Sequence, residues 1–108
     1  MTSFSDIDGI PATASDFLLD QVLREEWRFD GAVVSDWDAI HQLCVHGLCE
    51  NDVEATYLAA RAGVDIDMIS GVYERHLPEL VASERLPMDR IDELAGNVLR
   101  VKIQAGLM

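Results

Sequence analysis

A carboxylate and an indole lie just past the end of a short apolar segment, and this pair has the residue types for chemistry on a sugar. Residues 32–34 have the composition of a fully buried strand of a parallel sheet, and Asp36 and Trp37 follow its end. Strands flanked by helices carry their chemistry at their carboxyl ends, and an indole offers a flat apolar face to a sugar ring. Two interpretations of Asp36 are open: it takes part in chemistry, or it caps the following helix.

Histidines and cysteines crowd together further along the chain and raise the question of a zinc site. His41, Cys44, His46 and Cys49 lie within one short stretch, but four such positions on one helix point in different directions. No second cluster of His or Cys follows. We therefore expect structural thiols and a surface histidine, with no metal site. A Cys44–Cys49 disulfide is poorly placed if both residues lie on or near one helical turn.

Further aspartates lie where they could serve either a substrate or the fold. Asp65 and Asp67 could bind substrate hydroxyls, but we favour pairing with Arg or Lys of neighbouring units. Asp6 and Asp8 flank a turn, where Asx-turn chemistry accounts for them. Residues 70–73 form a loop that either touches substrate or simply connects two elements.

Hydrophobic periodicity predicts the elements that position these residues. The expected helices cover residues 15–27, 38–46, 51–63, 73–83 and 88–105, and strands are expected at 32–34 and 64–68. Ser15 is a candidate cap of the first helix, and Asn51 with Glu54 resembles a capping box. Strands that alternate with helices indicate an α/β fold with parallel strands, in one continuous segment.

Composition excludes several classes of partner. Hydrophobic residues make up 49% of the 108 residues, which is enough for a core, and the formal net charge is −12. Such acidity argues against nucleic acid and anionic membrane as partners. No apolar run approaches the ~20 residues of a membrane span, and no signal-peptide pattern is visible, so the compartment stays open.

The segments around Asp36 resemble those of the family-three glycoside hydrolases, most closely their bacterial β-glucosidase branch. The resemblance runs in register from Met1 to Met108. It rests on the Ser-Asp-Trp motif of residues 35–37 and on further matching segments, namely residues 3–13, 18–31, 39–40, 46–47, 62–68 and 76–80.

This resemblance implies a fold and a set of site residues. The fold is a (β/α) TIM-type barrel, of which residues 1–108 form the C-terminal part, with about three βα units and parallel strands. Asp36 corresponds to the catalytic nucleophile, Trp37 to a wall of the pocket for the non-reducing-end sugar, and Met1 and Phe4 to further pocket walls. The implied substrate is a β-linked glucoside or oligosaccharide, and no cofactor is implied.

Two positions depart from the pattern of this branch. Ser5 stands where the branch usually has Asn, and keeps a shorter hydrogen-bonding side chain. Asp38 stands where it usually has Gly. It places a second negative charge near Asp36, which would raise the pKa of Asp36 unless Asp38 points away.

The length leaves three interpretations of what the chain does. A complete barrel needs about 250 residues, and the upstream motifs of the family are absent from these 108. The chain is expected to be a fragment of a retaining β-glucosidase that is inactive alone, because its acid/base lies elsewhere. The alternatives are a non-catalytic interaction or scaffold module, and a half-barrel that needs a partner chain. Unpaired parallel strands favour association with the missing barrel segment or self-association.

Overall fold

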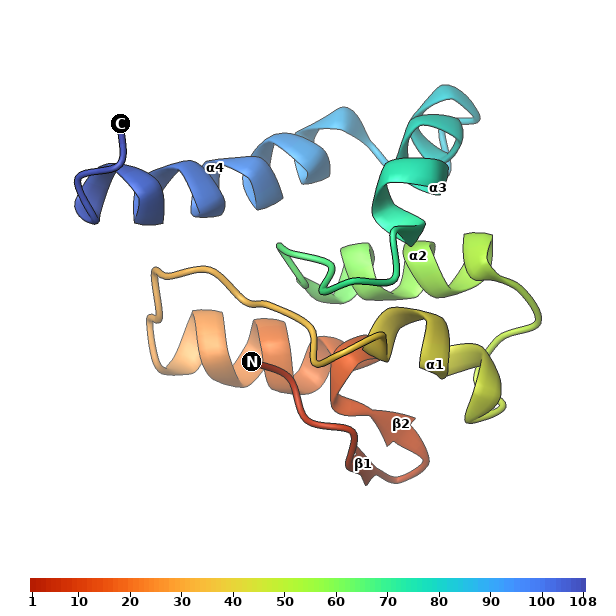
Figure 1. Ribbon diagram of the computed structural model, residues 1–108. Coiled ribbons are helices and arrows are strands. Elements are labelled where there is room, and N and C mark those ends of the chain that lie inside the picture. Colours follow the sequence, from red (N-terminus) through yellow and green to blue (C-terminus); the bar gives the residue numbers. More distant parts are fainter.

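The computed structural model describes residues 1–108, and helices form most of it (Figure 1). The α-helices are α1 (Ala39–Val45), α2 (Asp52–Ala62), α3 (Val72–Ala82) and α4 (Met88–Gln104). They follow a hairpin of β1 (Asp6–Ile7) and β2 (Ile10–Pro11), the 3-10 turn η1 (Ala12–Ala14) and the π-helix η2 (Phe17–Glu26). None of the helices is long and apolar enough to cross a membrane.

Local interactions explain where α2 begins and ends and where η2 begins. The side chain of Asn51 accepts a hydrogen bond from the Glu54 N–H at 2.9 Å, which confirms the predicted cap of α2. The helix ends at Gly63, whose φ of 117° lies in the left-handed region that glycine adopts without strain. Ser15 Oγ accepts from the Leu18 N–H at 3.2 Å, as expected for the start of η2.

The apolar core surrounds α2. One cluster joins alanines of α2 to large side chains of α1 and of the segments on either side, including Ile40, Leu43, Val64 and Val72. A second cluster lies between α2, α3 and α4 and consists of Ala60, Leu80, Leu86 and Leu94. Because the side chains of α2 at these positions are alanines, the neighbouring helices can pack closely against it.

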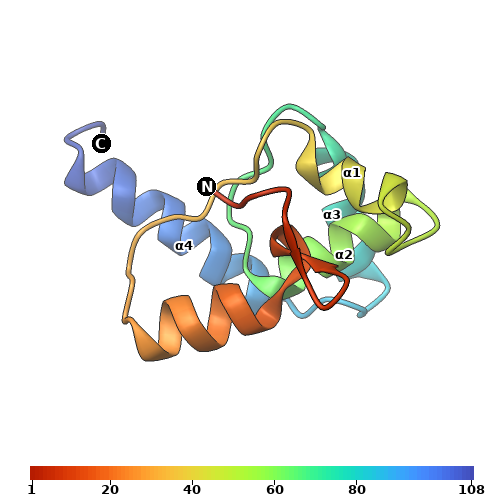
Figure 2. The same ribbon diagram turned by 90° about the horizontal axis from the view of Figure 1, so that it is seen from below.

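Three extended segments lie side by side (Figure 2), and for two of them, residues 32–34 and 64–68, the sequence predicts parallel strands. The Thr2 N–H donates to the Val34 carbonyl at 2.9 Å, and Val34 and Ile66 form an isolated parallel bridge. Residues 32–35 therefore lie between the N-terminal segment and residues 64–68.

The prediction of strands at residues 32–34 and 64–68 is wrong. The two segments form one isolated bridge and no continuous ladder of backbone hydrogen bonds. The Val33 N–H donates to the Asp65 carboxylate at 2.7 Å instead of to a backbone carbonyl. The Val33 carbonyl accepts from both Asp65 N–H and Ile66 N–H, at 2.8 and 3.1 Å. A side chain thus replaces the next backbone partner, and the pairing is limited to one bridge. The one sheet is the antiparallel β1–β2 hairpin, at the place where a turn was expected.

The carboxylate of Asp65 joins four parts of the chain. Besides Val33, it accepts from Arg24 Nη2 of η2 at 2.9 Å and from Asn97 Nδ2 of α4 at 3.0 Å. This confirms the predicted pairing of Asp65 with a basic side chain. Burial raises the pKa of the Asp65 carboxyl, and the hydrogen bonds from Asn97 and Val33 and the positive charge of Arg24 partly offset that effect.

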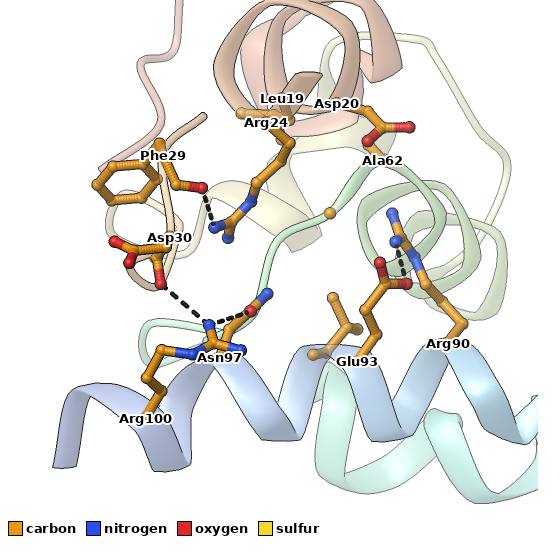
Figure 3. A pocket seen from close by; sticks show the side chains of 12 residues that line it. Leu19, Asp20, Arg24, Phe29, Asp30, Ala62, Arg90, Glu93, Asn97 and Arg100 are labelled. Carbon is orange, nitrogen blue, oxygen red and sulfur yellow. Dashed lines mark hydrogen bonds and ion pairs between the residues drawn. The ribbon is translucent and has the colours of Figure 1, made fainter. Parts of the chain in front are cut away.

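A hollow of about 230 Å³ lies beside this carboxylate, between η2, the segment before Ala32 and α4 (Figure 3). The arginines that line the hollow donate hydrogen bonds to backbone carbonyls. Arg24 donates to those of Phe29 and Gly31, and Arg100 donates to that of Asp30. Arg90 donates to two carbonyls at the end of α2. The hollow lies beside the start of residues 32–35, and Asp36 follows their end. The hollow and Asp36 are therefore at opposite ends of this segment.

Replacing Asp65 with Asn removes one acceptor oxygen and leaves a donor facing Arg24 or Asn97. We expect the free energy of unfolding at neutral pH to fall by about 1–3 kcal/mol, measured by urea denaturation of the 108-residue chain. The exposed Asp8→Asn serves as the control and leaves stability unchanged.

The same carboxyl also predicts a pH dependence. Because the pKa of Asp65 is raised in the folded state, the native chain binds this proton more tightly than the unfolded chain. The stability contributed by protonating Asp65 is complete below its unfolded pKa and is lost as the pH rises through its folded pKa. As the pH is lowered from the folded pKa of Asp65 toward its lower unfolded pKa, wild type should gain stability relative to Asp65→Asn. A constant difference across this range would contradict the prediction.

Candidate active site

Asp36 lies just beyond the Val34–Ile66 bridge, where the extended segment turns toward α1. The side chain is partly buried, and its Oδ1 accepts a hydrogen bond from the Trp37 N–H at 2.7 Å. The N-cap position of α1 is Asp38, so the helix-capping interpretation of Asp36 is wrong. The carboxylate keeps lone pairs for a further partner, as a nucleophile requires.

Trp37 follows with its side chain in solvent. Trp37 is 62% exposed, whereas tryptophan is highly buried on average. The combination of an accessible carboxylate and an uncovered aromatic face is suited to a carbohydrate, whose hydroxyls need acceptors and whose C–H faces pack on aromatic rings.

Asp38 adopts the left-handed conformation, with φ of 55° and ψ of 17°. Its Oδ2 accepts a hydrogen bond from Gln42 Nε2 at 3.2 Å, so this carboxylate is engaged by the first turns of α1. The left-handed backbone gives a physical reason why the β-glucosidase branch that the sequence resembles usually has Gly at this position, since glycine adopts that region without a Cβ penalty.

Ser35 fixes the backbone on which Asp36 sits. The serine is fully buried, and its Oγ accepts a hydrogen bond from the Met68 N–H at 2.8 Å. Its own N–H donates to the Ile66 carbonyl, and the Asp38 N–H donates to the Met68 carbonyl. Three hydrogen bonds thus hold residues 35–38 against residues 66–68. Sequence reasoning missed this role of Ser35, although the residue belongs to the Ser-Asp-Trp motif.

Asp67 does not pair with Arg or Lys, contrary to the prediction. Its Oδ1 accepts from Ser70 Oγ at 2.5 Å, and its Oδ2 accepts from the Tyr73 N–H at 3.3 Å. The carboxylate therefore shapes the loop of residues 70–73 before α3. This gives the loop a connecting role within the fold.

Met1 and Phe4 do not share one pocket with Asp36 and Trp37 in this structure. Met1 is 75% exposed and borders an apolar hollow of about 190 Å³ with Leu23 and Phe29 among its walls. Phe4 is 42% exposed and borders a different hollow of about 350 Å³ beside the β1–β2 hairpin.

His41 and the two cysteines of residues 41–49 have separate partners. His41 Nδ1 lies 2.6 Å from Asp52 Oδ1, a hydrogen bond that raises the pKa of His41. The sulfurs of Cys44 and Cys49 contact each other. No group of three or more His, Cys, Asp or Glu side chains is arranged to hold a metal ion.

Comparison with known proteins adds to this geometry. Residues 1–101 match the model of the glycosyl hydrolase family 3 N-terminal domain. The periplasmic β-glucosidase of Salmonella typhimurium is 39% identical over 107 residues, which are 99% of this chain and 14% of that protein. The crystal structure of a β-glucosidase from Listeria innocua superposes with a TM-score of 0.95 at 37% identity, over 97% of this chain and 14% of that one.

The chain belongs to glycosyl hydrolase family 3. Its relatives in this family carry the names β-glucosidase and β-xylosidase, for example a β-xylosidase of Formosa agariphila that is 31% identical over 115 residues. The family is therefore one of glycoside hydrolases. This family-3 chain spans about one seventh of the length of the relatives it matches, given the 14% of each that it covers.

Ser35→Ala tests the link between residues 35–38 and 66–68 of the family-3 chain. Removing the hydroxyl leaves the Met68 N–H without its acceptor, so we expect a loss of about 1–3 kcal/mol in the free energy of unfolding. Urea denaturation measures it, with Ser3→Ala as the matched control because Ser3 is exposed. Equal stabilities of the two variants would show that the buried link contributes nothing.

Asp38→Gly tests the cost of the left-handed backbone. Glycine adopts this conformation without the Cβ penalty, so we expect the variant to be more stable than Asp38→Ala by about 1 kcal/mol. Both variants lose the carboxylate and its hydrogen bond to Gln42, which isolates the backbone effect. The prediction fails if Asp38→Ala is as stable as Asp38→Gly by thermal or urea denaturation.

Proposed function

We propose that residues 1–108 supply the catalytic nucleophile, Asp36, of a retaining β-glucosidase. The observation that carries this proposal is the position of Asp36 at the end of the segment that pairs with residues 64–68, beside the exposed indole of Trp37. The neighbouring carboxylates of Asp38 and Asp67 are engaged by residues of their own segments. Asp36 accepts only from the Trp37 N–H and remains available to a substrate.

The proposed fold of the active protein is a (β/α) barrel to which these residues contribute about three βα units. The order of the extended segments supports it, because residues 32–35 lie between the N-terminal segment and residues 64–68. In such a barrel the carboxyl ends of the strands form the active-site face, and Asp36 follows one of those ends. The names of the relatives favour β-glucosides over other glycosides as substrates.

The proposed mechanism is a double displacement. The ionised Asp36 attacks the anomeric carbon as the aglycone oxygen leaves, and water then hydrolyses the covalent glycosyl-enzyme with net retention. A second carboxyl group, about 5–5.5 Å from Asp36, must protonate the leaving oxygen and later deprotonate the water. We assign that role to a residue outside 1–108. Within the chain, Glu54 is paired with Arg85 at 2.8 Å.

Trp37, Met1 and Phe4 are proposed to line the pocket of the non-reducing-end sugar. Trp37 supplies an exposed aromatic face next to the nucleophile. Met1 and Phe4 lie on the same short segment as Thr2, whose N–H donates to the Val34 carbonyl, so both lie on the segment adjacent to that of Asp36. Their exposed side chains are available to contact a sugar or the rest of a barrel.

Asp36→Asn is the decisive change. Residues 1–108 would replace the matching segment of the Listeria innocua β-glucosidase, and hydrolysis of an aryl β-glucoside would be followed. We expect a loss of about 10⁴-fold or more in kcat, because the amide is nearly isosteric with the carboxylate but a far poorer nucleophile. A 2-fluoro glucoside should label Asp36, as read by peptide mass mapping.

The matched control is Asp38→Asn in the same chimera, which should cost far less activity. Labelling of Asp38, or substantial turnover by Asp36→Asn, would assign the nucleophile to another residue. The unchanged 108-residue chain by itself should not hydrolyse the aryl glucoside, since half of the carboxyl pair is missing.

A further inference from the structure

The chain holds two cysteines, and the structure brings their sulfurs together. Cys44 Sγ lies 3.0 Å from Cys49 Sγ, and both side chains are partly buried against the core cluster of α1 and α2. The sequence argument against a disulfide assumed that both residues lie on or near one helical turn. That assumption is wrong, because α1 ends at Val45 and Cys49 lies beyond it.

The end of α1 explains why the two thiols meet. The Gly47 N–H donates to the Cys44 carbonyl and the Leu48 N–H donates to the Leu43 carbonyl, each at 3.0 Å. Gly47 has a φ of 82°, the left-handed conformation that reverses the chain after a helix. The reversal carries residues 48–49 back over the last turn of α1, where Cys49 faces Cys44.

We propose that Cys44 and Cys49 form an oxidisable dithiol that closes to an intrachain disulfide linking the end of α1 to the segment before α2. A disulfide requires the sulfurs to approach to about 2.05 Å. Of residues 45–48 between them, 45–47 are exposed and can adjust, whereas Leu48 packs against the core cluster. The established family assignment does not require this pair.

The oxidant we name is a small-molecule disulfide such as oxidised glutathione. One protein thiolate attacks it and releases one thiol, leaving a mixed disulfide. The second protein thiolate attacks the protein sulfur of that mixed disulfide and releases the second thiol. Two cysteines are thereby oxidised, and one small-molecule disulfide is reduced to two thiols.

The surroundings indicate the order of attack. Burial raises the pKa of the Cys49 thiol to about 12, and the hydrogen bond with Cys44 and the charges of Cys44, Glu54 and Asp52 add to the effect. Ionising Cys49 is therefore disfavoured, and Cys44 is the first attacker. Once closed, the bond would hold the end of the helix that begins three residues after Asp36.

The test equilibrates the 108-residue chain with defined ratios of reduced and oxidised glutathione. Free thiols are then trapped with N-ethylmaleimide, and intact mass is measured. We expect a species without any label that is lighter than the reduced chain by two hydrogen atoms, and a peptide joining Cys44 to Cys49 after digestion. The equilibrium constant should exceed that of the urea-unfolded chain by about tenfold or more, because folding places the sulfurs in contact.

Single variants serve as matched controls. Cys44→Ser and Cys49→Ser should each stop at the mixed disulfide with glutathione and retain no intrachain bond. Persistence of two labelled thiols in oxidising buffer, disulfide-linked dimers, or an equilibrium constant no larger than in urea would each overturn the proposal.

Discussion

The buried carboxylate of Asp65 is the constraint on which the arrangement depends. It takes the place of a backbone partner for Val33 and at the same time holds Arg24 of η2 and Asn97 of α4. A carboxylate without water is tolerated only when donors surround it, so all three donors must come into place together. At the other end of residues 32–35, Ser35 Oγ accepts a hydrogen bond from the Met68 N–H. Asp36 follows a backbone that is fixed at both ends.

Much of this arrangement is local enough to be read from the sequence. Helix periodicity, the Asn51 cap and the Gly63 stop depend on neighbours within one turn, and the structure confirms them. The pairing of Asp65 with a basic residue follows from the cost of burying a charge. The position of Asp36 after an apolar segment was likewise visible from residue types.

Other features depend on contacts between distant parts of the chain and could not be read in this way. Periodicity shows that residues 32–34 are apolar and extended, but not that the carboxylate of Asp65 interrupts the pairing there. The left-handed turn at Gly47, which brings Cys49 back to Cys44, likewise requires the backbone path. The separate surroundings of Met1 and Phe4 depend on how the N-terminal segment lies. The roles of Asp36, Trp37, Met1 and Phe4 in a reaction stay predictions.

The hydrogen bonds made by the arginines around the hollow beside α4 affect which positions can change among members of the family. Arg24, Arg90 and Arg100 all donate to main-chain carbonyls, and every amino acid supplies such an acceptor. Residues such as Asp30 and Arg61 can therefore change identity without removing the acceptor. Substitution of the arginine itself is what breaks the contact. In an alignment, these carbonyl contacts would add no co-varying partner to the arginine, and methods that infer proximity from correlated substitutions would detect only its side-chain pairs, such as Arg24 with Asp65.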